Sequence, residues 1–205
     1  SNPTFLLDAL RSVGDSDDYL TFLLSPMGHR SEVPIRFSIT RSDYFAAADG
    51  CGLRQIELNT LAASYIGLGG RVADFHNALG ACTGASWRAR ENRPLDGVVD
   101  GFVAALREYG GASGYVMFVV EANERNILDQ RLLEVGLSLR GVRVIRRTLE
   151  ELGTCARIQN GELFVDGKLI AISYFRAGLR FEELNCEAAR RGCQVIAHSS
   201  TISVP

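Results

Sequence analysis

The run GYVMFVVEA at residues 114–122 restricts the possible folds more than any other segment of the chain. It is almost continuously apolar and ends in polar residues, which is typical of a strand covered on both faces of a parallel sheet. Apolar residues at helical spacing follow from Ile127 to Val135, and Gly141 ends that pattern before VRVIRRT at 142–148. These segments predict a strand, a helix and a second strand parallel to the first, joined by a right-handed crossover.

The segments on either side of this unit extend it to a larger α/β sheet. Alternating or β-branched segments predict strands, and capping residues followed by apolar periodicity predict helices. NG and DG pairs within residues 156–175 predict a meander of hairpins. The other expected strands are 33–40, 53–59 and 194–197, and the other expected helices lie within 1–25, from about 71, at 96–109 and at 180–192. We therefore expect a three-layer α/β fold, with a mostly parallel sheet flanked by helices and an attached antiparallel hairpin.

Composition limits the class of protein. A length of 205 residues with 46% hydrophobic content fits one domain with a sizeable core. The formal charge of −2 provides no broad basic field, so we expect no nucleic-acid partner. No apolar run is long enough to span a bilayer, so we expect no membrane contact. The 5 cysteines are scattered without C-x-x-C spacing, which indicates reduced thiols in the cytoplasm rather than a zinc site.

Polar side chains follow the expected strands at the ends where α/β proteins bind ligands. Arginine offers a donor fork for carboxylate or phosphate, whereas Glu, Asn and Gln offer oxygens for an ammonium group or a hard cation. Together they suit a zwitterionic, amino-acid-like ligand, and each one alone fits an ordinary polar loop equally well. The residues concerned are Arg41, Glu57, Asn59, Ser64, Glu124, Arg125, Asn126, Gln130 and Arg176.

Glu57 and Asn59 stand two positions apart in an expected strand, so their side chains point to the same face. Two such oxygens beside a phosphate group could hold Mg²⁺, which keeps its other positions for water and nucleotide. A solvated polar strand face is an equally good interpretation of these two residues alone. The glycines at 67–71 lack the third glycine of a dinucleotide-binding motif, and no Walker A, G-x-S-x-G or H-E-x-x-H motif occurs.

Five motifs, in this order and spacing, resemble the eukaryotic-type glutathione synthetases. They are TRSDYF (40–45), QIELNTLAAS (55–64), ERNILDQR (124–131), VIRRT (144–148) and LFVDGKLIAISYFRAG (163–178). The resemblance implies an ATP-grasp ligase that joins γ-glutamylcysteine to glycine. MgATP would phosphorylate the cysteinyl carboxylate, and the amine of glycine would displace phosphate. Such a site needs Mg²⁺ and cationic side chains rather than a protein nucleophile, because charge builds on phosphoryl oxygens.

The same resemblance implies roles for individual residues. Arg41 resembles a substrate-binding arginine, and Glu57 and Asn59 resemble Mg²⁺ ligands, with Glu57 also facing ATP. The other implied substrate contacts are Ala62, Ala63, Ser64, Glu124, Arg125, Asn126, Gln130, Arg176 and Gly178. Two positions depart from the family, because Ala62 replaces a serine and Leu179 replaces a tyrosine. Both changes take away a hydroxyl group that the family would use for hydrogen bonds to the dipeptide.

The resemblance also implies an organisation into lobes. Residues 1–32 would be a helical segment of a neighbouring lobe, residues 33–205 would be the substrate-binding domain, and the ATP-grasp lobes would lie outside this chain. We therefore expect no ligation by this chain alone, a homodimer for the full-length enzyme and a cytoplasmic location. The alternative is a stand-alone α/β module that binds a thiol peptide or an amino acid without chemistry.

Overall fold

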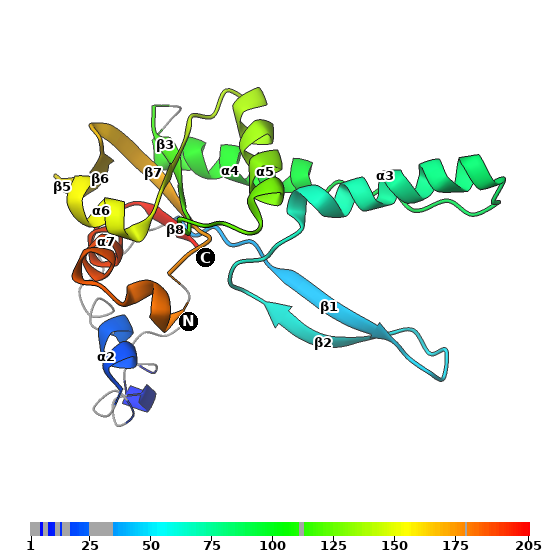
Figure 1. Cartoon of the computed structure of the whole chain (residues 1–205), viewed down its shortest axis with the longest axis horizontal. Helices are drawn as coiled ribbons and strands as arrows, with labels where there is room; N and C mark the ends of the chain where they lie inside the picture. The colour runs from blue at the N-terminus through cyan, green and yellow to red at the C-terminus, as the bar shows by residue number, and fades with distance from the viewer. Residues whose placement is uncertain are drawn as a thin grey trace.

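The computed structural model describes residues 5, 8–10, 13, 17–24, 35–110, 113–178 and 180–205. Its body is a 6-stranded mixed sheet with helices on both faces, from which a 2-stranded sheet and a long helix extend (Figure 1). The predicted α/β class, with a sheet flanked by helices, is confirmed. Among the helices of these residues, none combines the length and the apolarity that crossing a membrane requires.

The central sheet is built around two parallel neighbours, β3 (Tyr115–Val119) and β7 (Lys168–Phe175). The first part of β7 is antiparallel to β6, and its second part is parallel to β8. β4 is parallel to β3 at one edge, and β5 is antiparallel to β6 at the other. The predicted crossover and hairpin meander are therefore both present. The bounds are β4 (Val144–Arg147), β5 (Ala156–Gln159), β6 (Glu162–Val165) and β8 (Ile202–Val204).

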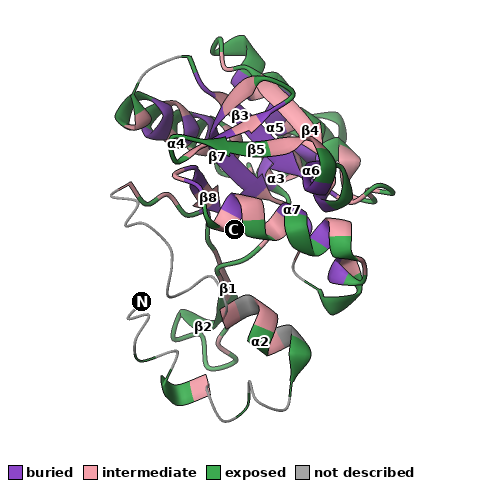
Figure 2. Ribbon diagram, turned by 90° about the vertical axis from the view of Figure 1, so that its left-hand side faces the viewer, coloured by how far each residue is buried: buried purple, intermediate pink, exposed green. Residues whose placement is uncertain are grey.

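Alternate residues of β3 enter two different cores, which explains its continuous apolar sequence. Val116 and Phe118 pack with α4 and α5 on one face, whereas Met117 and Val119 pack with α6 and α7 on the other. Figure 2 shows the buried residues gathered around this sheet. The helices are α4 (Pro94–Tyr109), α5 (Ile127–Leu139), α6 (Leu149–Cys155) and α7 (Glu187–Ala197).

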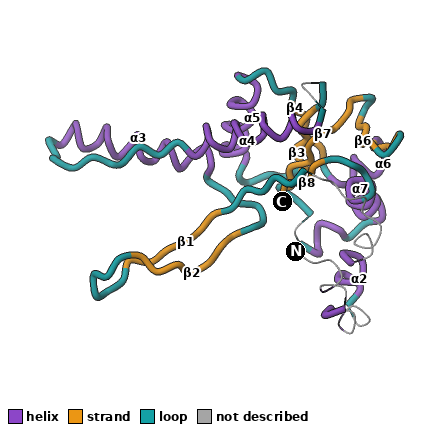
Figure 3. Tube along the Cα trace, turned by 180° about the vertical axis from the view of Figure 1, so that it is seen from behind, coloured by secondary structure: helices purple, strands orange, loops and turns teal. Residues whose placement is uncertain are grey.

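Two arms extend from the same side of the body (Figures 1 and 3). One arm is α3 (Ile66–Thr83), and the other is a ribbon of two antiparallel strands, β1 (Arg41–Ala46) and β2 (Leu53–Asn59). The ribbon forms a sheet of its own instead of joining the main sheet. Two short helices complete the described elements, α2 (Asp18–Leu24) and the 3₁₀ helix η1 (Phe181–Leu184). α2 belongs to the N-terminal segment expected at 1–32, whose assignment to a neighbouring lobe stays a prediction.

Two predicted boundaries in the first half of the chain are wrong. The segment 33–40 is not a strand in its described part, 35–40, and the strand β1 begins only at Arg41. The apolar alternation of this segment serves packing instead, because Ile39 is buried in the core beside α4. The helix expected from about residue 71 begins earlier, at Ile66.

The C-terminal predictions also differ from the structure. The helix expected at 180–192 is divided between η1 and α7, and the strand expected at 194–197 lies inside α7. Ala189, Gly192 and Ile196 are buried at helical spacing, so the β-branched residues there do not alternate between two faces. The prediction also missed α6. Its signal is TLEE at 148–151, which forms a capping box in the structure.

Candidate functional site

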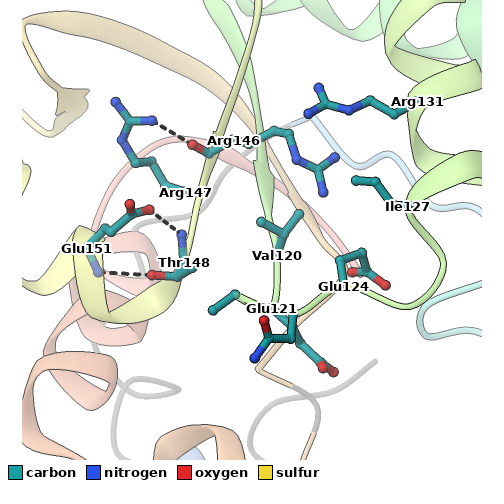
Figure 4. Close-up of a pocket in the computed structure, with 11 residues that line it drawn as sticks. Val120, Glu121, Glu124, Ile127, Arg131, Arg146, Arg147, Thr148 and Glu151 are labelled. Carbon is teal, nitrogen blue, oxygen red and sulfur yellow. Dashed lines mark hydrogen bonds between the residues drawn. The ribbon is translucent and has the colours of Figure 1, made fainter.

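The carboxyl ends of β3 and β4 lie next to each other, because the two strands are parallel neighbours. The connections that follow them leave on opposite faces of the sheet. β3 leads into α5 on one face, whereas β4 leads into α6 on the other. Parallel sheets bind ligands at such a switch point, because the two loops diverge and leave a crevice between them. A cavity of about 730 Å³ lies there, lined by the end of β3 and its loop, by α5, by the end of β4 and by α6 (Figure 4).

The cavity separates positive from negative side chains. Along its upper side in Figure 4 lie Arg131, Arg146 and Arg147, and below them lie Glu121, Glu124 and Glu151. Some of these groups are already engaged. Arg147 donates to Asp166 and to the carbonyl of Arg146, and the bond to Asp166 raises the pKa of Arg147. Arg131 and Glu124 keep hydrogen-bonding atoms for a ligand, because Arg131 donates only through Nη1 and Glu124 accepts only at Oε1 in the described contacts.

Arg176 joins the end of β7 to the small-residue loop after β2. Its backbone N–H donates to the carbonyl of Val119 at 2.8 Å. Its Nη1 donates to the carbonyl of Ala63 at 3.1 Å, and its Nη2 donates to Oγ of Ser64 at 2.8 Å. Its Nε is buried and has no acceptor among the described residues. The predicted residues Ala63, Ser64 and Arg176 therefore lie together, with one buried donor unused.

Asp129 of α5 fixes the shape of this loop. Its Oδ2 accepts the N–H of Tyr65 at 2.7 Å, and its Oδ1 accepts the N–H groups of Gly67 at 2.8 Å and Leu68 at 3.0 Å. The carboxylate thus supplies acceptors to the first turn of α3, whose N–H groups have no partner within the helix. Sequence reasoning missed Asp129. The available signal in the sequence was an acidic residue inside the apolar pattern of α5. In the structure Asp129 is only 5% exposed, and a carboxylate buried to this degree needs polar partners.

The glycines of the opening turn of α3 have a packing role. A Cβ atom on Gly67 would lie 2.6 Å from Cβ of Leu132, so glycine lets α3 and α5 touch. Ala62 has a left-handed backbone, with φ of 47°, and its carbonyl accepts the hydroxyl of Ser64 at 3.2 Å. The loop therefore keeps a tight shape although Ala62 lacks the hydroxyl expected there.

Of the predicted residues after β3, Glu124 lines the cavity at the switch point, and Gln130 bonds to Arg146, which also lines it. Oε1 of Glu124 accepts the N–H of Asn126 at 2.9 Å. Oε1 of Gln130 accepts Nη2 of Arg146 at 2.8 Å, and Nε2 of Gln130 is buried without a partner among the described residues. Arg125, by contrast, is exposed. The segment after β3 therefore contributes a second unused buried donor.

The contacts of Gly178 in the described structure are with η1 and α6. Its N–H donates to the carboxylate of Glu183 in η1, and a Cβ atom on it would lie 3.1 Å from Cδ1 of Leu149 in α6. It has a φ of 86°, which favours glycine at this turn. Leu179, where we expected a lost hydroxyl group, lies outside the described residues.

The residues predicted to hold Mg²⁺ lie on the ribbon and not at the edge of the main sheet. The register pairs Arg41 with Asn59 and Asp43 with Glu57, so four polar side chains share one face. Arg41 donates to Asp43 through Nε at 2.8 Å and Nη2 at 2.9 Å, which holds the pKa of Asp43 below its usual range. Asn59 donates through Nδ2 to Oε1 of Glu57 at 3.0 Å. Sequence reasoning missed Asp43, although it stands two positions from Arg41 on the same strand face.

The polar side chains on this face of the ribbon could supply some of the oxygen ligands of Mg²⁺, but not a complete set. Asn59 turns its NH₂ group to the carboxylates of Asp43 and Glu57, so its carbonyl oxygen is left over beside them. Carboxylate and carboxamide oxygens are typical Mg²⁺ ligands, and the ion keeps water or nucleotide in its other positions. In the part of the chain that the structure describes, no three His, Cys, Asp or Glu side chains form a metal-binding group. Glu57 and Asn59 can therefore offer two ligands but not a closed protein site.

Comparison with known proteins agrees with the motifs. Residues 114–205 match the sequence model of the family described as eukaryotic glutathione synthase. The chain is 34% identical over 190 residues to glutathione synthetase of Homo sapiens, a match that covers 86% of this chain and 40% of the human protein. It is 32% identical over 212 residues to the chloroplastic glutathione synthetase of Solanum lycopersicum, covering 98% of this chain and 39% of that protein. Most of this chain is therefore similar to one part of a eukaryotic-type glutathione synthetase.

The chain spans about 40% of the length of the curated relatives it matches. Its fold is similar to that of a solved glutathione synthetase-like effector from Globodera pallida in its apo form. That likeness has a TM-score of 0.66 at 22% sequence identity and covers 81% of this chain and 39% of the effector chain. At this identity the likeness concerns the fold alone.

The predicted cytoplasmic location stays a prediction. The Solanum lycopersicum relative is named chloroplastic, so the similarity leaves the compartment open. All five cysteines lie within the described ranges and are free thiols.

Proposed function

We propose that this chain forms the γ-glutamylcysteine-binding part of a glutathione synthetase, which joins that dipeptide to glycine with ATP and Mg²⁺. The observation that carries the proposal is the arrangement of Arg176. In a chain similar to glutathione synthetases, its guanidinium is held against Ala63 and Ser64 while its buried Nε has no acceptor in the described structure. The similarity to glutathione synthetases supports a role in glutathione biosynthesis.

The charges around the site match the charges of the dipeptide. γ-Glutamylcysteine carries carboxylates and one ammonium group, and guanidinium groups bind carboxylates through directed, charge-assisted hydrogen bonds. Arg176 and Arg131 both have donors left over, whereas Glu124 has a carboxylate oxygen left over for an ammonium group. The separation of positive and negative side chains in the cavity therefore favours a zwitterionic ligand over a simple phosphate.

ATP and Mg²⁺ would bind at the body end of the ribbon. Glu57 and Asn59 would hold the ion, which neutralises charge on phosphoryl oxygens when it is bound. Arg41 would turn its remaining nitrogen, Nη1, towards substrate, because Asp43 engages only its Nε and Nη2. Asp43 would keep the guanidinium fixed beside Glu57.

A second candidate is a binding module without ligase activity. Ala62 favours this alternative, because the loop keeps its left-handed backbone at φ 47° while lacking a hydroxyl group. For this chain alone we expect dipeptide binding without ligation, and we propose ligation and homodimer formation for a full-length enzyme.

Calorimetric titration with γ-glutamylcysteine tests the proposal. We expect the parent chain to bind the dipeptide and Arg176→Lys to bind it about tenfold or more weakly, because charge-assisted hydrogen bonds contribute about 1.5–3 kcal/mol. Arg157→Lys, at an exposed position of β5, serves as the control and should bind like the parent. Absence of binding by the folded parent, or equal binding by Arg176→Lys, would refute the assignment.

A ligation assay tests the inactivity that both candidates predict for this chain alone. Incubation of the chain with γ-glutamylcysteine, glycine and MgATP should yield no glutathione. Formation of glutathione by the purified chain would exclude the module without chemistry and would contradict the expected inactivity.

A further inference from the structure

A buried network of charges connects β4 to the inner side of α5. Glu134 accepts Nη1 of Arg146 and Nη1 of Arg131, and Nη2 of Arg146 donates to Oε1 of Gln130 at 2.8 Å. The side chains of Arg146 and Glu134 are only 16% and 11% exposed. Gln130 and Glu134 stand four positions apart, so they lie on one face of the helix. One arginine therefore contacts both of them at once.

This network determines the orientation of the Gln130 carboxamide. A guanidinium group has only donors, so the group that faces Arg146 must be the carbonyl oxygen of Gln130. The NH₂ group then points away from Arg146, and its Nε2 is buried without an acceptor among the described residues. Gln130 itself is only 3% exposed. Buried donors are nearly always paired in folded proteins, so Nε2 of Gln130 is available to an acceptor that a ligand could bring.

Glu134 holds Arg146 in the position from which it orients the carboxamide of Gln130. An uncompensated guanidinium would be expensive to bury, and the carboxylate of Glu134 pairs with Nη1 of Arg146 while Nη2 donates to Gln130. Arg131 binds the same carboxylate from the cavity side, where it is 57% exposed. Arg131, Glu134 and Arg146 therefore form one hydrogen-bonded network that holds the uncharged side chain of Gln130.

We propose that Arg146 and Glu134 are positioning residues that present the NH₂ group of Gln130 to an oxygen acceptor of the bound dipeptide. The acceptor is a carboxylate or amide oxygen, and a ligand with a donor at that point is rejected because two donors would face each other. This inference rests on the proposed function, since it adds a source of selectivity to the same site. Neither Arg146 nor Glu134 needs to touch the ligand.

A double-mutant cycle tests the proposal by calorimetric titration with γ-glutamylcysteine. Arg146→Lys keeps a charge beside Glu134 but loses the fork that reaches Glu134 and Gln130 together. We expect it to weaken binding about five- to tenfold in the parent chain. In a Gln130→Met background, which has no carboxamide to orient, the same substitution should change affinity less than about twofold. A merely structural role of Arg146 would weaken binding equally in both backgrounds and would overturn the proposal.

An NMR measurement and a second substitution complete this test. In ¹⁵N spectra, the dipeptide should shift the side-chain NH₂ signal of Gln130 in the parent but not in Arg146→Lys, and equal shifts would contradict the inference. If Arg146→Lys does not fold, Glu134→Gln replaces it in the same cycle with the same expected coupling to Gln130. Arg157→Lys is the control throughout.

The outcome also distinguishes this inference from the function on which it rests. Absence of binding by the folded parent chain refutes the proposed function and this inference with it. Binding by the parent that Arg146→Lys leaves unchanged refutes the inference alone.

Discussion

At the scale of single residues, Asp129 has the largest influence on the geometry of the site. One carboxylate from α5 accepts backbone N–H groups of Tyr65, Gly67 and Leu68, at distances from 2.7 to 3.0 Å. These bonds fix the start of α3, and the loop with Ser64 lies directly before it. Arg176 then binds that loop from the end of β7. The position of the loop that we propose to face the dipeptide therefore depends on a residue of another element, α5.

Replacement of Asp129 by asparagine should destabilise the protein. An amide in this position offers one acceptor oxygen and turns its NH₂ group towards a backbone donor, which leaves a buried N–H unpaired at a cost of about 1–3 kcal/mol. The free energy of unfolding in urea measures this loss. Amide hydrogen exchange should also become faster at residues 65–68.

Asp74 provides a matched control for Asp129→Asn. It lies in the same helix that Asp129 caps, its side chain is 71% exposed, and its ion pair with Arg71 is long, at 3.5 Å. Asp74→Asn should change the free energy of unfolding by less than about 0.5 kcal/mol. If both variants have the same stability as the parent, the carboxylate of Asp129 does not hold the loop.

At the scale of elements, the contact between α6 and α7 depends on two glycines. A Cβ atom on Gly153 would lie 2.1 Å from the carbonyl oxygen of Ala188, and one on Gly192 would lie 2.1 Å from the carbonyl oxygen of Leu149. Each glycine therefore lets the backbone of the other helix approach directly. This close contact covers the face of the sheet opposite to α5, where β4 leads into α6.

Gly153→Ala should lower the free energy of unfolding by about 1–3 kcal/mol, because the added methyl group forces two backbones apart in a packed core. Gly97→Ala in α4 is the control, since no atom lies within 4 Å of the added carbon. That control should be neutral or stabilising by up to about 1 kcal/mol, through the higher helix propensity of alanine. Thermal or urea unfolding of the two variants should therefore give opposite signs. A Gly153→Ala variant as stable as the parent would show that α6 and α7 can separate freely.

At the scale of the whole molecule, the ribbon of β1 and β2 differs from the body because it leaves apolar side chains exposed. The body encloses both cores, whereas the ribbon extends away from it (Figure 3) and most of its residues are exposed. Tyr44, Leu53, Ile56 and Leu58 are each at least 52% exposed. A two-stranded ribbon is marginally stable in water by itself. The ribbon therefore has apolar surface left to cover.

This apolar surface should be detectable in solution. The parent chain should bind a hydrophobic fluorescent dye, and the double variant Ile56→Thr, Leu58→Thr should bind less of it, because threonine keeps β propensity but removes apolar area. Val135→Thr on α5 is the control, since this valine is exposed but lies outside the ribbon. Equal dye fluorescence of the double variant and the parent would show that the ribbon face is covered in solution.

The sequence by itself determined the α/β unit around β3, the hairpin turns and the polar residues that follow β3 and β7. These features depend on local patterns, because periodicity, turn residues and strand ends are properties of short segments. Resemblance to a known family then assigned roles to Arg176 and Ser64, which the structure brings together at 2.8 Å.

Only the tertiary structure decided the contacts that hold the site. Asp129 reaches backbone groups that are 61 to 64 positions away along the chain, and Arg146 reaches Gln130 from another element 16 positions away. It also decided that β1 and β2 leave the main sheet, which no local pattern showed. The physical reason is the same in each case. A hydrogen bond or a strand pairing between distant segments depends on how helices and sheets pack, and that packing is a property of the whole chain.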